Sequence, residues 1–139
     1  MRTTPLIAHR GESYDAPENT LAAVNLAWEC GATAVEVDVH LTSDGEICVI
    51  HDTNTHRTTG VRRVVRRTAY NELKLLDAGA YKDSKWIGER IPTLKEVLDT
   101  VPQHGKLIVE IKDHKGLLGK LKQLIEKSTL GDDQVEIIA

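Results

Sequence analysis

The chain has 139 residues, of which 40% are hydrophobic and 28% are charged, and its formal net charge at pH 7 is −3. This balance is typical of one globular domain with a hydrophobic core, and it excludes a disordered chain. The mild net acidity argues against nucleic-acid binding, because no basic field covers the whole chain.

Two further features of the sequence concern location. Cys30 and Cys48 lack a Cys-x-x-Cys spacing, so we expect reduced thiols rather than a disulfide or zinc framework. No apolar stretch approaches the ~20 residues that span a bilayer, so we expect no stable membrane insertion. Together these features predict a cytoplasmic protein.

The first predicted elements are a short strand and a helix. Residues 6–9 form a short apolar run, which is weak evidence for a strand when taken alone. Pro17-Glu18-Asn19 predicts the first turn of a helix, with proline at a favourable position and glutamate complementing the helix dipole. Apolar residues then recur at helical spacing, and Gly31 is placed to end the helix.

The segment from 34 to 41 predicts a strand with two different faces. Valines occupy one parity of the segment and polar residues the other, so the polar groups share one face of the strand. Ser43-Asp44-Gly45 predicts a turn, and a further strand follows over residues 47–50. The polar residues of the shared face are Glu36, Asp38 and His40.

Residues 51–91 are irregular, apart from a short helical piece near residues 71–77. We interpret this stretch as a small insertion after the second strand of the main pattern. It contains four arginines, which we interpret as part of a solvated loop rather than a binding patch. These are Arg62, Arg63, Arg66 and Arg67.

The last third of the chain returns to alternating elements. Thr93 and Glu96 form a capping box that predicts the start of a helix. A strand over residues 106–112, a helix over 117–125 and a strand over 135–139 follow. The resulting order, β-α-β-(insertion)-α-β-α-β, predicts an α/β fold with a parallel sheet and right-handed crossovers. No linker divides the chain into domains.

Polar residues gather at the carboxyl ends of three predicted strands. These are His9 and Arg10, then Glu36 and Asp38, then Glu110 and Lys112. In (β/α)8 barrels and other parallel α/β folds, active sites are built at this rim. The coincidence at three strands therefore predicts a functional site.

The carboxylates of this set indicate a metal site. Glu36 and Asp38 would point from one strand into an apolar sheet, where two unpartnered like charges are costly. A divalent cation would remove the cost, and oxygen ligands suit Mg²⁺ or Ca²⁺ better than zinc. Glu110 could supply a third carboxylate from the neighbouring strand. The alternative is a pair of surface acids on an antiparallel strand, which the parallel order disfavours.

The remaining polar residues suit acid–base chemistry on a phosphate. His9 can give or take a proton near neutral pH, and the fork of Arg10 fits two phosphate oxygens. His51, followed by Asp52, could act in the same way, and the alternative is an ordinary loop histidine. Lys112 fits either a phosphate contact or a structural ion pair.

Seven short segments occur in a specific order, although each is weak alone. They are His9-Arg10-Gly11, Pro17-Glu18-Asn19-Thr20, residues 36–45 (EVDVHLTSDG), His51-Asp52, Arg57-Thr58-Thr59-Gly60, Ile91-Pro92-Thr93-Leu94 and Glu110-Ile111-Lys112. This ordered set resembles the signature of the glycerophosphodiester phosphodiesterase family. The resemblance runs from about residue 6 to the last residue and covers the N-terminal half of the domain.

The resemblance implies a fold and a role for each site residue. The fold is a TIM barrel with a small insertion after strand 2, here about residues 51–91 of a partial domain spanning residues 1–139. Asn19 is expected to lie near the site and to orient it, and the alternative is that its motif only starts a helix. The implied roles are metal ligands for Glu36, Asp38 and Glu110, general acid and base for His9 and His51, and phosphate contacts for Arg10 and Lys112.

The implied activity is metal-dependent hydrolysis of a small glycerophosphodiester to glycerol 3-phosphate and an alcohol, with Mg²⁺ or Ca²⁺ as cofactor. In the family, a neighbouring hydroxyl is expected to attack first and to give a cyclic phosphate that water opens. The resemblance does not say which histidine is the acid and which the base.

The chain is short for this fold, because a TIM barrel needs about 250 residues and eight βα units. We expect only the first four units, a half-barrel. Three alternatives follow: an active phosphodiesterase as a dimer or within a longer chain, a catalytically inactive half-barrel that retains metal or phosphate binding, or a phospholipase D-like lyase. We rank the lyase last, because no membrane-docking surface is evident.

Exposed apolar residues around 135–138 predict self-association into a homo-oligomer.

Overall fold

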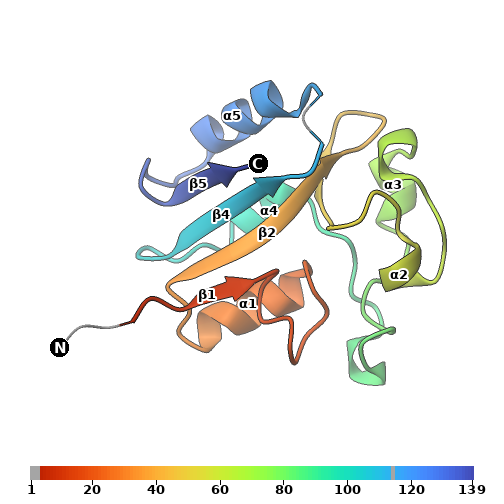
Figure 1. The fold of residues 1–139 in the computed structure, drawn as a ribbon, viewed down its shortest axis with the longest axis horizontal. Helices are drawn as coiled ribbons and strands as arrows, with labels where there is room; N and C mark the ends of the chain where they lie inside the picture. The colour runs from red at the N-terminus through yellow and green to blue at the C-terminus, as the bar shows by residue number, and fades with distance from the viewer. Residues whose placement is uncertain (1–3, 114) are drawn as a thin grey trace.

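The computed structural model describes residues 4–113 and 115–139, and a parallel sheet organises them. Strands β1 (Ile7–His9), β2 (Ala34–Leu41), β4 (Lys106–Ile111) and β5 (Val135–Ile138) lie side by side in that order, and each pair of neighbours is parallel (Figure 1). The predicted parallel sheet of four strands is therefore confirmed. The fourth unit of the expected half-barrel is represented by its strand, β5.

A fifth strand forms an antiparallel hairpin with β2. Strand β3 (Ile47–Val49) pairs antiparallel with the end of β2, and its register joins Val39 to Val49. The turn at Asp44-Gly45 is the one predicted from the sequence, and Gly45 takes the positive φ of 85° that the reversal requires. This hairpin leads the chain away from the sheet and into the insertion.

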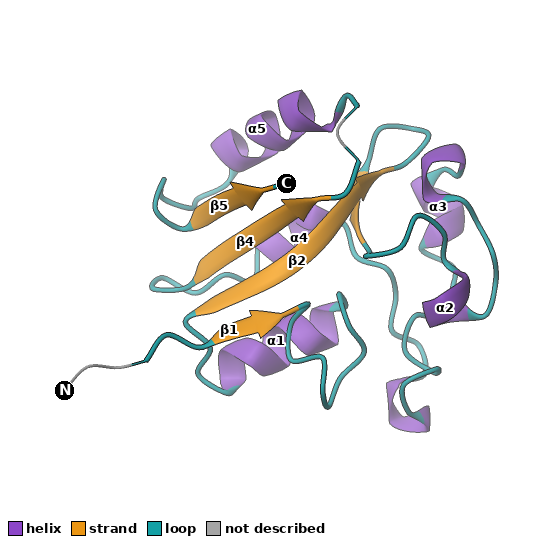
Figure 2. Cartoon of the chain, in the orientation of Figure 1, coloured by secondary structure: helices purple, strands orange, loops and turns teal. Residues whose placement is uncertain are grey.

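Three helices cover one face of the sheet (Figure 2). They are α1 (Leu21–Glu29), α4 (Leu94–Leu98) and α5 (Leu117–Lys127). The odd-numbered valines of β2 face these helices and are fully buried, as are Leu107 and Val109 of β4. The other parity of β2 is thereby turned to the opposite face, which no helix covers in Figure 1. That opposite face carries the predicted polar residues.

The start of α1 differs from the prediction. The helix begins at Leu21 rather than at Pro17, because Asn19 has a φ of 59° that no α-helix can contain. Thr20 caps the helix instead, and its side chain accepts a hydrogen bond from the N–H of Ala23. The Pro17–Thr20 motif therefore precedes the helix, and it is free to hold Asn19 against the sheet. Gly31, with a φ of 85°, follows the helix end as predicted.

Helix α4 begins with the predicted capping box. The side chain of Thr93 accepts from the N–H of Glu96, and the Glu96 side chain accepts from the N–H of Thr93. The helix is short and amphipathic, and it buries Leu94, Val97 and Leu98 against the sheet. This start places α4 directly after the insertion.

The insertion has more regular structure than the sequence indicated. It contains two short helices, α2 (His56–Thr59) and α3 (Tyr70–Leu73), and two 3₁₀ turns, η1 (Val65–Arg67) and η2 (Ser84–Trp86). Helix α3 overlaps the single helical piece expected near residues 71–77, and the other three elements were not expected. Periodicity could not reveal elements of three or four residues. The insertion packs around a small apolar cluster of its own: Cys48, Ile50, Val65, Leu73, Ala78 and Ile91.

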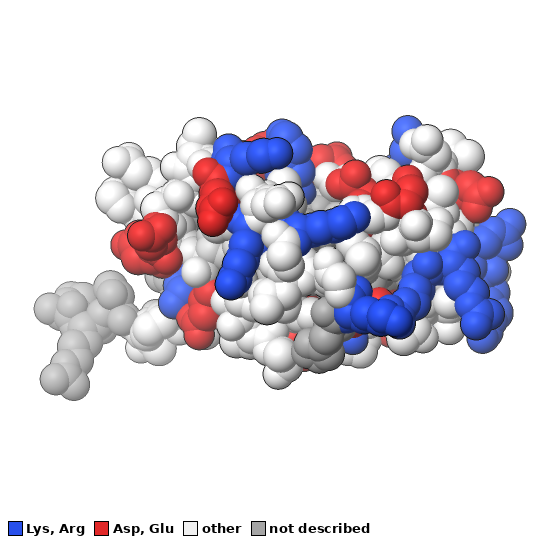
Figure 3. Space-filling model, turned by 90° about the horizontal axis from the view of Figure 1, so that it is seen from above, with Lys and Arg blue, Asp and Glu red and all other residues white. Residues whose placement is uncertain are grey.

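Charge is unevenly spread over the surface. Figure 3 shows Lys and Arg side chains gathered at the end of the molecule where the insertion lies. The four arginines between residues 62 and 67 are all exposed, as expected for a solvated loop, and Arg66 Nε lies 3.6 Å from Asp113 Oδ2. In the described part of the chain, no helix is both long enough and apolar enough to cross a bilayer.

Candidate active site

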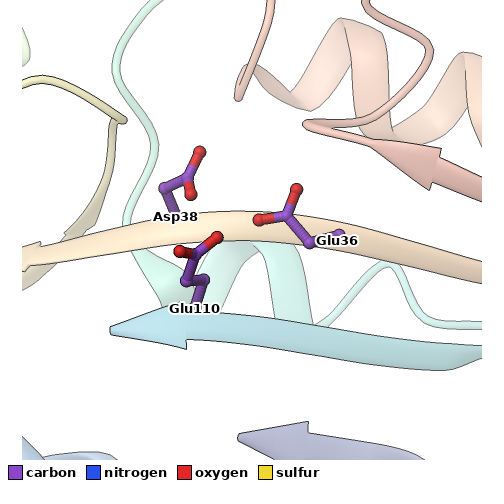
Figure 4. Close-up of side chains that lie close together, drawn as sticks. All are labelled: Glu36, Asp38 and Glu110. Carbon is purple, nitrogen blue, oxygen red and sulfur yellow. The ribbon is translucent and has the colours of Figure 1, made fainter. Parts of the chain in front are cut away.

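The register of the sheet brings the predicted polar residues together. His9 on β1 lies beside Glu36 on β2, and Asp38 on β2 lies beside Glu110 on β4. Because the strands are parallel, these residues share the carboxyl-end region of the sheet and its helix-free face. Figure 4 shows the carboxylates of Glu36, Asp38 and Glu110 on the same side of β2 and β4.

The three carboxylates lie close enough together that they could hold one cation. One oxygen from each of Glu36, Asp38 and Glu110 lies within 4.8 Å of the others. Glu36 and Asp38 are buried, and their Oε1 and Oδ1 atoms have no hydrogen-bond partner. Buried carboxylate oxygens normally accept a hydrogen bond, so these two have capacity left for a further ligand, although Asp38 Oδ1 also lies 3.6 Å from Lys112 Nζ. A hard divalent cation such as Mg²⁺ or Ca²⁺ fits an all-oxygen donor set.

The electrostatics of the cluster also fit a cation. Burial, followed by the charge of Asp38, raises the pKa of Glu36 from its ordinary 4.5 to about 7. Without a cation, the cluster therefore favours a proton on Glu36. A bound cation would remove the same repulsion and would release that proton.

Two residues of the loop after β1 hold Asp38 and Glu36 in place. Asn19 Nδ2 donates to Asp38 Oδ2 over 3.0 Å, and its Oδ1 accepts from the backbone N–H of Asp38 over 3.2 Å. The backbone N–H of Arg10 donates to Glu36 Oε2 over 3.2 Å. Arg10 has a φ of 58°, and its Nε lies 3.3 Å from Asp38 Oδ2. The expectation that Asn19 lies near the site and orients it therefore agrees with the structure.

Lys112 is a second positively charged side chain, besides Arg10, that lies next to the carboxylates. Its Nζ lies 2.8 Å from Glu110 Oε1 and 3.6 Å from Asp38 Oδ1. The hydrogen bond to Glu110 and the charge of Asp38 raise the pKa of Lys112. Arg10 and Lys112 thus contact different oxygens of the Asp38 carboxylate.

The two candidate acid–base residues have different surroundings. His9 is exposed, and its Nε2 lies 3.4 Å from Glu36 Oε2. His51 follows the hairpin, and its Nδ1 lies 2.9 Å from Asp52 Oδ1. His40, on the polar parity of β2, is buried and donates from Nε2 to the backbone carbonyl of His51 over 2.9 Å. Burial lowers the pKa of His40, which favours the neutral imidazole.

The sequence assigned no catalytic or binding role to Glu18, Asp52 and Arg57, three charged residues beside the site. Glu18 contacts Arg10 and Arg57, and Arg57 also contacts Asp52. His51 is joined through them to the carboxylate cluster. Sequence reasoning assigned Glu18 to a helix dipole and gave Arg57 no function, because both lie in irregular segments where spacing carries no information about contacts. The only signal was their presence in the ordered segments.

The chain is similar to known proteins of one family. The profile described as "Glycerophosphoryl diester phosphodiesterase family" matches residues 9–128. A glycerophosphodiester phosphodiesterase from Caldanaerobacter subterraneus is 47% identical over 110 residues, which are 78% of this chain and 45% of that protein. Glycerophosphodiester phosphodiesterase 1 of Mus musculus is 44% identical over 111 residues, which are 78% of this chain and 34% of that protein.

Solved structures show the same fold. An Oleispira antarctica phosphodiesterase in complex with the product sn-glycerol-3-phosphate superposes with a TM-score of 0.89 at 36% identity, over 96% of this chain and 56% of that one. A glycerophosphodiester phosphodiesterase from Agrobacterium tumefaciens gives 0.89 at 31% identity, over 99% of this chain and 59% of that one.

The chain spans only about a third to three fifths of the length of these relatives and structures. The expected fold class is confirmed: an α/β parallel sheet that forms part of a TIM barrel. With a family profile covering most of its residues, the chain belongs to the glycerophosphoryl diester phosphodiesterase family.

Proposed function

We propose that this chain carries the metal and acid–base half of a phosphodiesterase site that hydrolyses glycerophosphodiesters to glycerol 3-phosphate and an alcohol. The observation that carries the proposal is the cluster of Glu36, Asp38 and Glu110, with two buried carboxylate oxygens that accept no hydrogen bond. It is supported by the product named for the Oleispira structure.

Each residue has a role that follows from its place. Glu36, Asp38 and Glu110 would hold Mg²⁺ or Ca²⁺, which when bound withdraws charge from the phosphate as a Lewis acid. Arg10 and Lys112 would contact the phosphate oxygens and stabilise the charge that develops on them. Asn19 keeps Asp38 pointing into the site through its two hydrogen bonds.

The histidines would move the protons. One of His9 and His51 removes the proton from the attacking hydroxyl, either the glycerol 2-hydroxyl or water. The other gives a proton to the oxygen of the departing alcohol. With the 2-hydroxyl as nucleophile, the new P–O bond closes a cyclic phosphate, and water then opens it with the two roles exchanged. Glycerol 3-phosphate and a free alcohol account for all the atoms.

A second candidate function is supported by the length of the match. The chain spans about half of each related structure, and the helix-free face of its sheet is open. A half-barrel that binds the cation or a phosphate without turnover is consistent with both observations.

The test is release of glycerol 3-phosphate from glycerophosphocholine by the purified chain, with Mg²⁺, with Ca²⁺ and with EDTA. His9→Ala removes the candidate proton carrier, and His104→Ala, at an exposed loop position, is the matched control. Metal-dependent turnover that is lost only in His9→Ala supports the enzyme.

Calorimetric titration with each cation separates the two candidates. Cation binding without turnover by a folded chain supports the inactive half-barrel. A folded chain that neither binds the cation nor turns over substrate would contradict both.

A further inference from the structure

One guanidinium group holds two carboxylates beside the site. Arg57 donates from Nη1 to Glu18 Oε2 over 3.0 Å and from Nη2 to Glu18 Oε1 over 2.6 Å. It also donates from Nε to Asp52 Oδ2 over 2.9 Å and from Nη2 to Asp52 Oδ1 over 3.0 Å. Each carboxylate is therefore bound by two parallel hydrogen bonds, an arrangement that fixes the orientation as well as the distance.

The two carboxylates lead to opposite parts of the proposed site. Glu18 Oε1 accepts from Arg10 Nη1 over 3.2 Å, and Arg10 lies against Asp38. Asp52 Oδ1 lies 2.9 Å from Nδ1 of His51. Arg57 thus connects a phosphate-contacting arginine to a candidate acid–base histidine without facing the carboxylate cluster itself.

The contact with Asp52 decides which nitrogen of His51 carries the proton. Hydrogen bonds from Arg57 hold the pKa of Asp52 at about 2, against the opposing effect of burial, and His51 adds to the lowering. An ionised carboxylate can only accept, so Nδ1 of His51 must donate to it. In the neutral imidazole, Nε2 then keeps its lone pair and is the atom that exchanges a proton with substrate.

We propose that Arg57 is a positioning residue that, through Asp52, fixes the tautomer and orientation of His51 and, through Glu18, the side chain of Arg10. The proposal rests on the proposed function, because it assumes that His51 moves a proton. It assigns a role to the insertion: α2, which begins at His56, carries Arg57 across to the loop that follows β1.

The planar geometry of the Arg57 guanidinium group matters more for positioning the two carboxylates than its charge does. The Arg57 side chain is 46% exposed, so water and salt screen its attraction for the two carboxylates. A lysine would keep the charge, but it could not form two parallel pairs of hydrogen bonds at once. We therefore expect Arg57→Lys to behave like Arg57→Met rather than like the natural chain.

The test uses the full chain with ¹⁵N-labelled histidine, in EDTA, at a pH high enough that the ring ¹⁵N shifts no longer change with pH and the imidazoles are neutral. Ring ¹⁵N shifts report whether Nδ1 or Nε2 of His51 is protonated, and the His51→Gln spectrum identifies the signals. Arg57→Met and Arg57→Lys are compared with Arg62→Met, an exposed arginine of the same insertion. Glycerophosphocholine turnover is measured on the same samples.

We expect His51 to be protonated mainly on Nδ1 in the natural chain and in Arg62→Met, and to lose that preference in both Arg57 variants. Turnover should fall by about 10- to 100-fold in kcat, as for other misplaced catalytic groups, with little change in KM. An unchanged tautomer in Arg57→Met would overturn the proposal, as would an equal change in Arg62→Met. If the natural chain shows no turnover, the proposed function fails for this chain, and the spectra still decide the role of Arg57.

Discussion

The side chain of Asn19 forms hydrogen bonds with both the side chain and the backbone of Asp38. The amide of Asn19 donates to Asp38 Oδ2 and accepts from the Asp38 N–H, over 3.0 and 3.2 Å. Asn19 can do so because its backbone has a φ of 59°, a left-handed conformation that asparagine tolerates better than most residues. The loop before α1 is thereby part of the candidate metal site.

Asn19→Ala should weaken both the fold and the site. It removes two buried hydrogen bonds and places a Cβ residue in a left-handed conformation, so we expect a loss of about 2–4 kcal/mol in the free energy of unfolding. Asn19→Gly is the matched control, because it removes the same hydrogen bonds without the backbone cost. Urea denaturation should rank the chains natural, Gly, Ala. Equal stability of the natural and Ala chains would contradict the role of Asn19.

Divalent cations should stabilise the chain through Asp38. A ligand that binds only the folded chain adds about 2.7 kcal/mol when present at 100 times its dissociation constant. We expect Ca²⁺ or Mg²⁺ to raise the melting temperature of the natural chain and not that of Asp38→Asn. Glu126→Gln removes an exposed acid on α5 and should respond like the natural chain. A cation shift that survives in Asp38→Asn would place the binding elsewhere.

The stability of the metal-free chain should fall as the pH rises towards neutrality. Glu36 ionises near 4.5 in the unfolded chain but near 7 in the folded one, so the folded state holds an extra proton between these values. Unfolding is therefore favoured as the pH rises through this window, by at most about 3 kcal/mol. In EDTA, Glu36→Gln should match the natural chain at pH 4.5 and exceed it in stability at pH 8. An identical pH dependence of the two chains would exclude Glu36 as the cause.

The sequence predicted the sheet and the carboxylate cluster for one physical reason. In a parallel sheet the strand order and the two-residue alternation together determine which side chains meet, so Glu36, Asp38 and Glu110 could be placed on one face before the structure was known. The same logic placed His9 at the carboxyl-end rim of the sheet, and the observed register then sets it beside Glu36. In regular elements, the spacing of residues along the sequence therefore predicts which side chains lie close together.

The network of Arg57 could not be predicted in this way. Glu18 and Arg57 are 39 positions apart and lie outside the strands, so no period relates them. The interruption of the helix before Leu21 was also missed, because proline and glutamate at a first turn are typical of real helices. Asn19 takes a left-handed conformation that ends this preference for a helix. Its tertiary contacts with β2 stabilise that conformation, and they cannot be read from local sequence.

Gly11, in the loop after β1, should be harder to replace by alanine than Gly60 in the insertion. A Cβ at Gly11 would lie 2.6 Å from the backbone carbon of Ala23 in α1, whereas a Cβ at Gly60 would meet nothing within 4 Å. Both glycines have positive φ, of 79° and 76°, so each alanine variant has the same backbone cost of about 1–2 kcal/mol. Urea denaturation should show that Gly11→Ala loses about 1–3 kcal/mol more than Gly60→Ala, because α1 must move. Equal losses would show that the loop can shift away from the helix.

The isolated chain should associate through the open face and edges of its sheet. Ile7 on β1 is 55% exposed, and Ile138 on β5 is also exposed; by register both share the face that carries the carboxylates. These two edge strands have unpaired backbone groups beside exposed apolar side chains, which favours strand-to-strand contact between copies. Light scattering should show a concentration-dependent rise in mass that Ile7→Lys and Ile138→Lys reduce. Leu75→Lys changes an equally apolar residue of the insertion, 73% exposed, and should leave the mass unchanged. A natural chain that stays monomeric at high concentration would show that these edges do not pair.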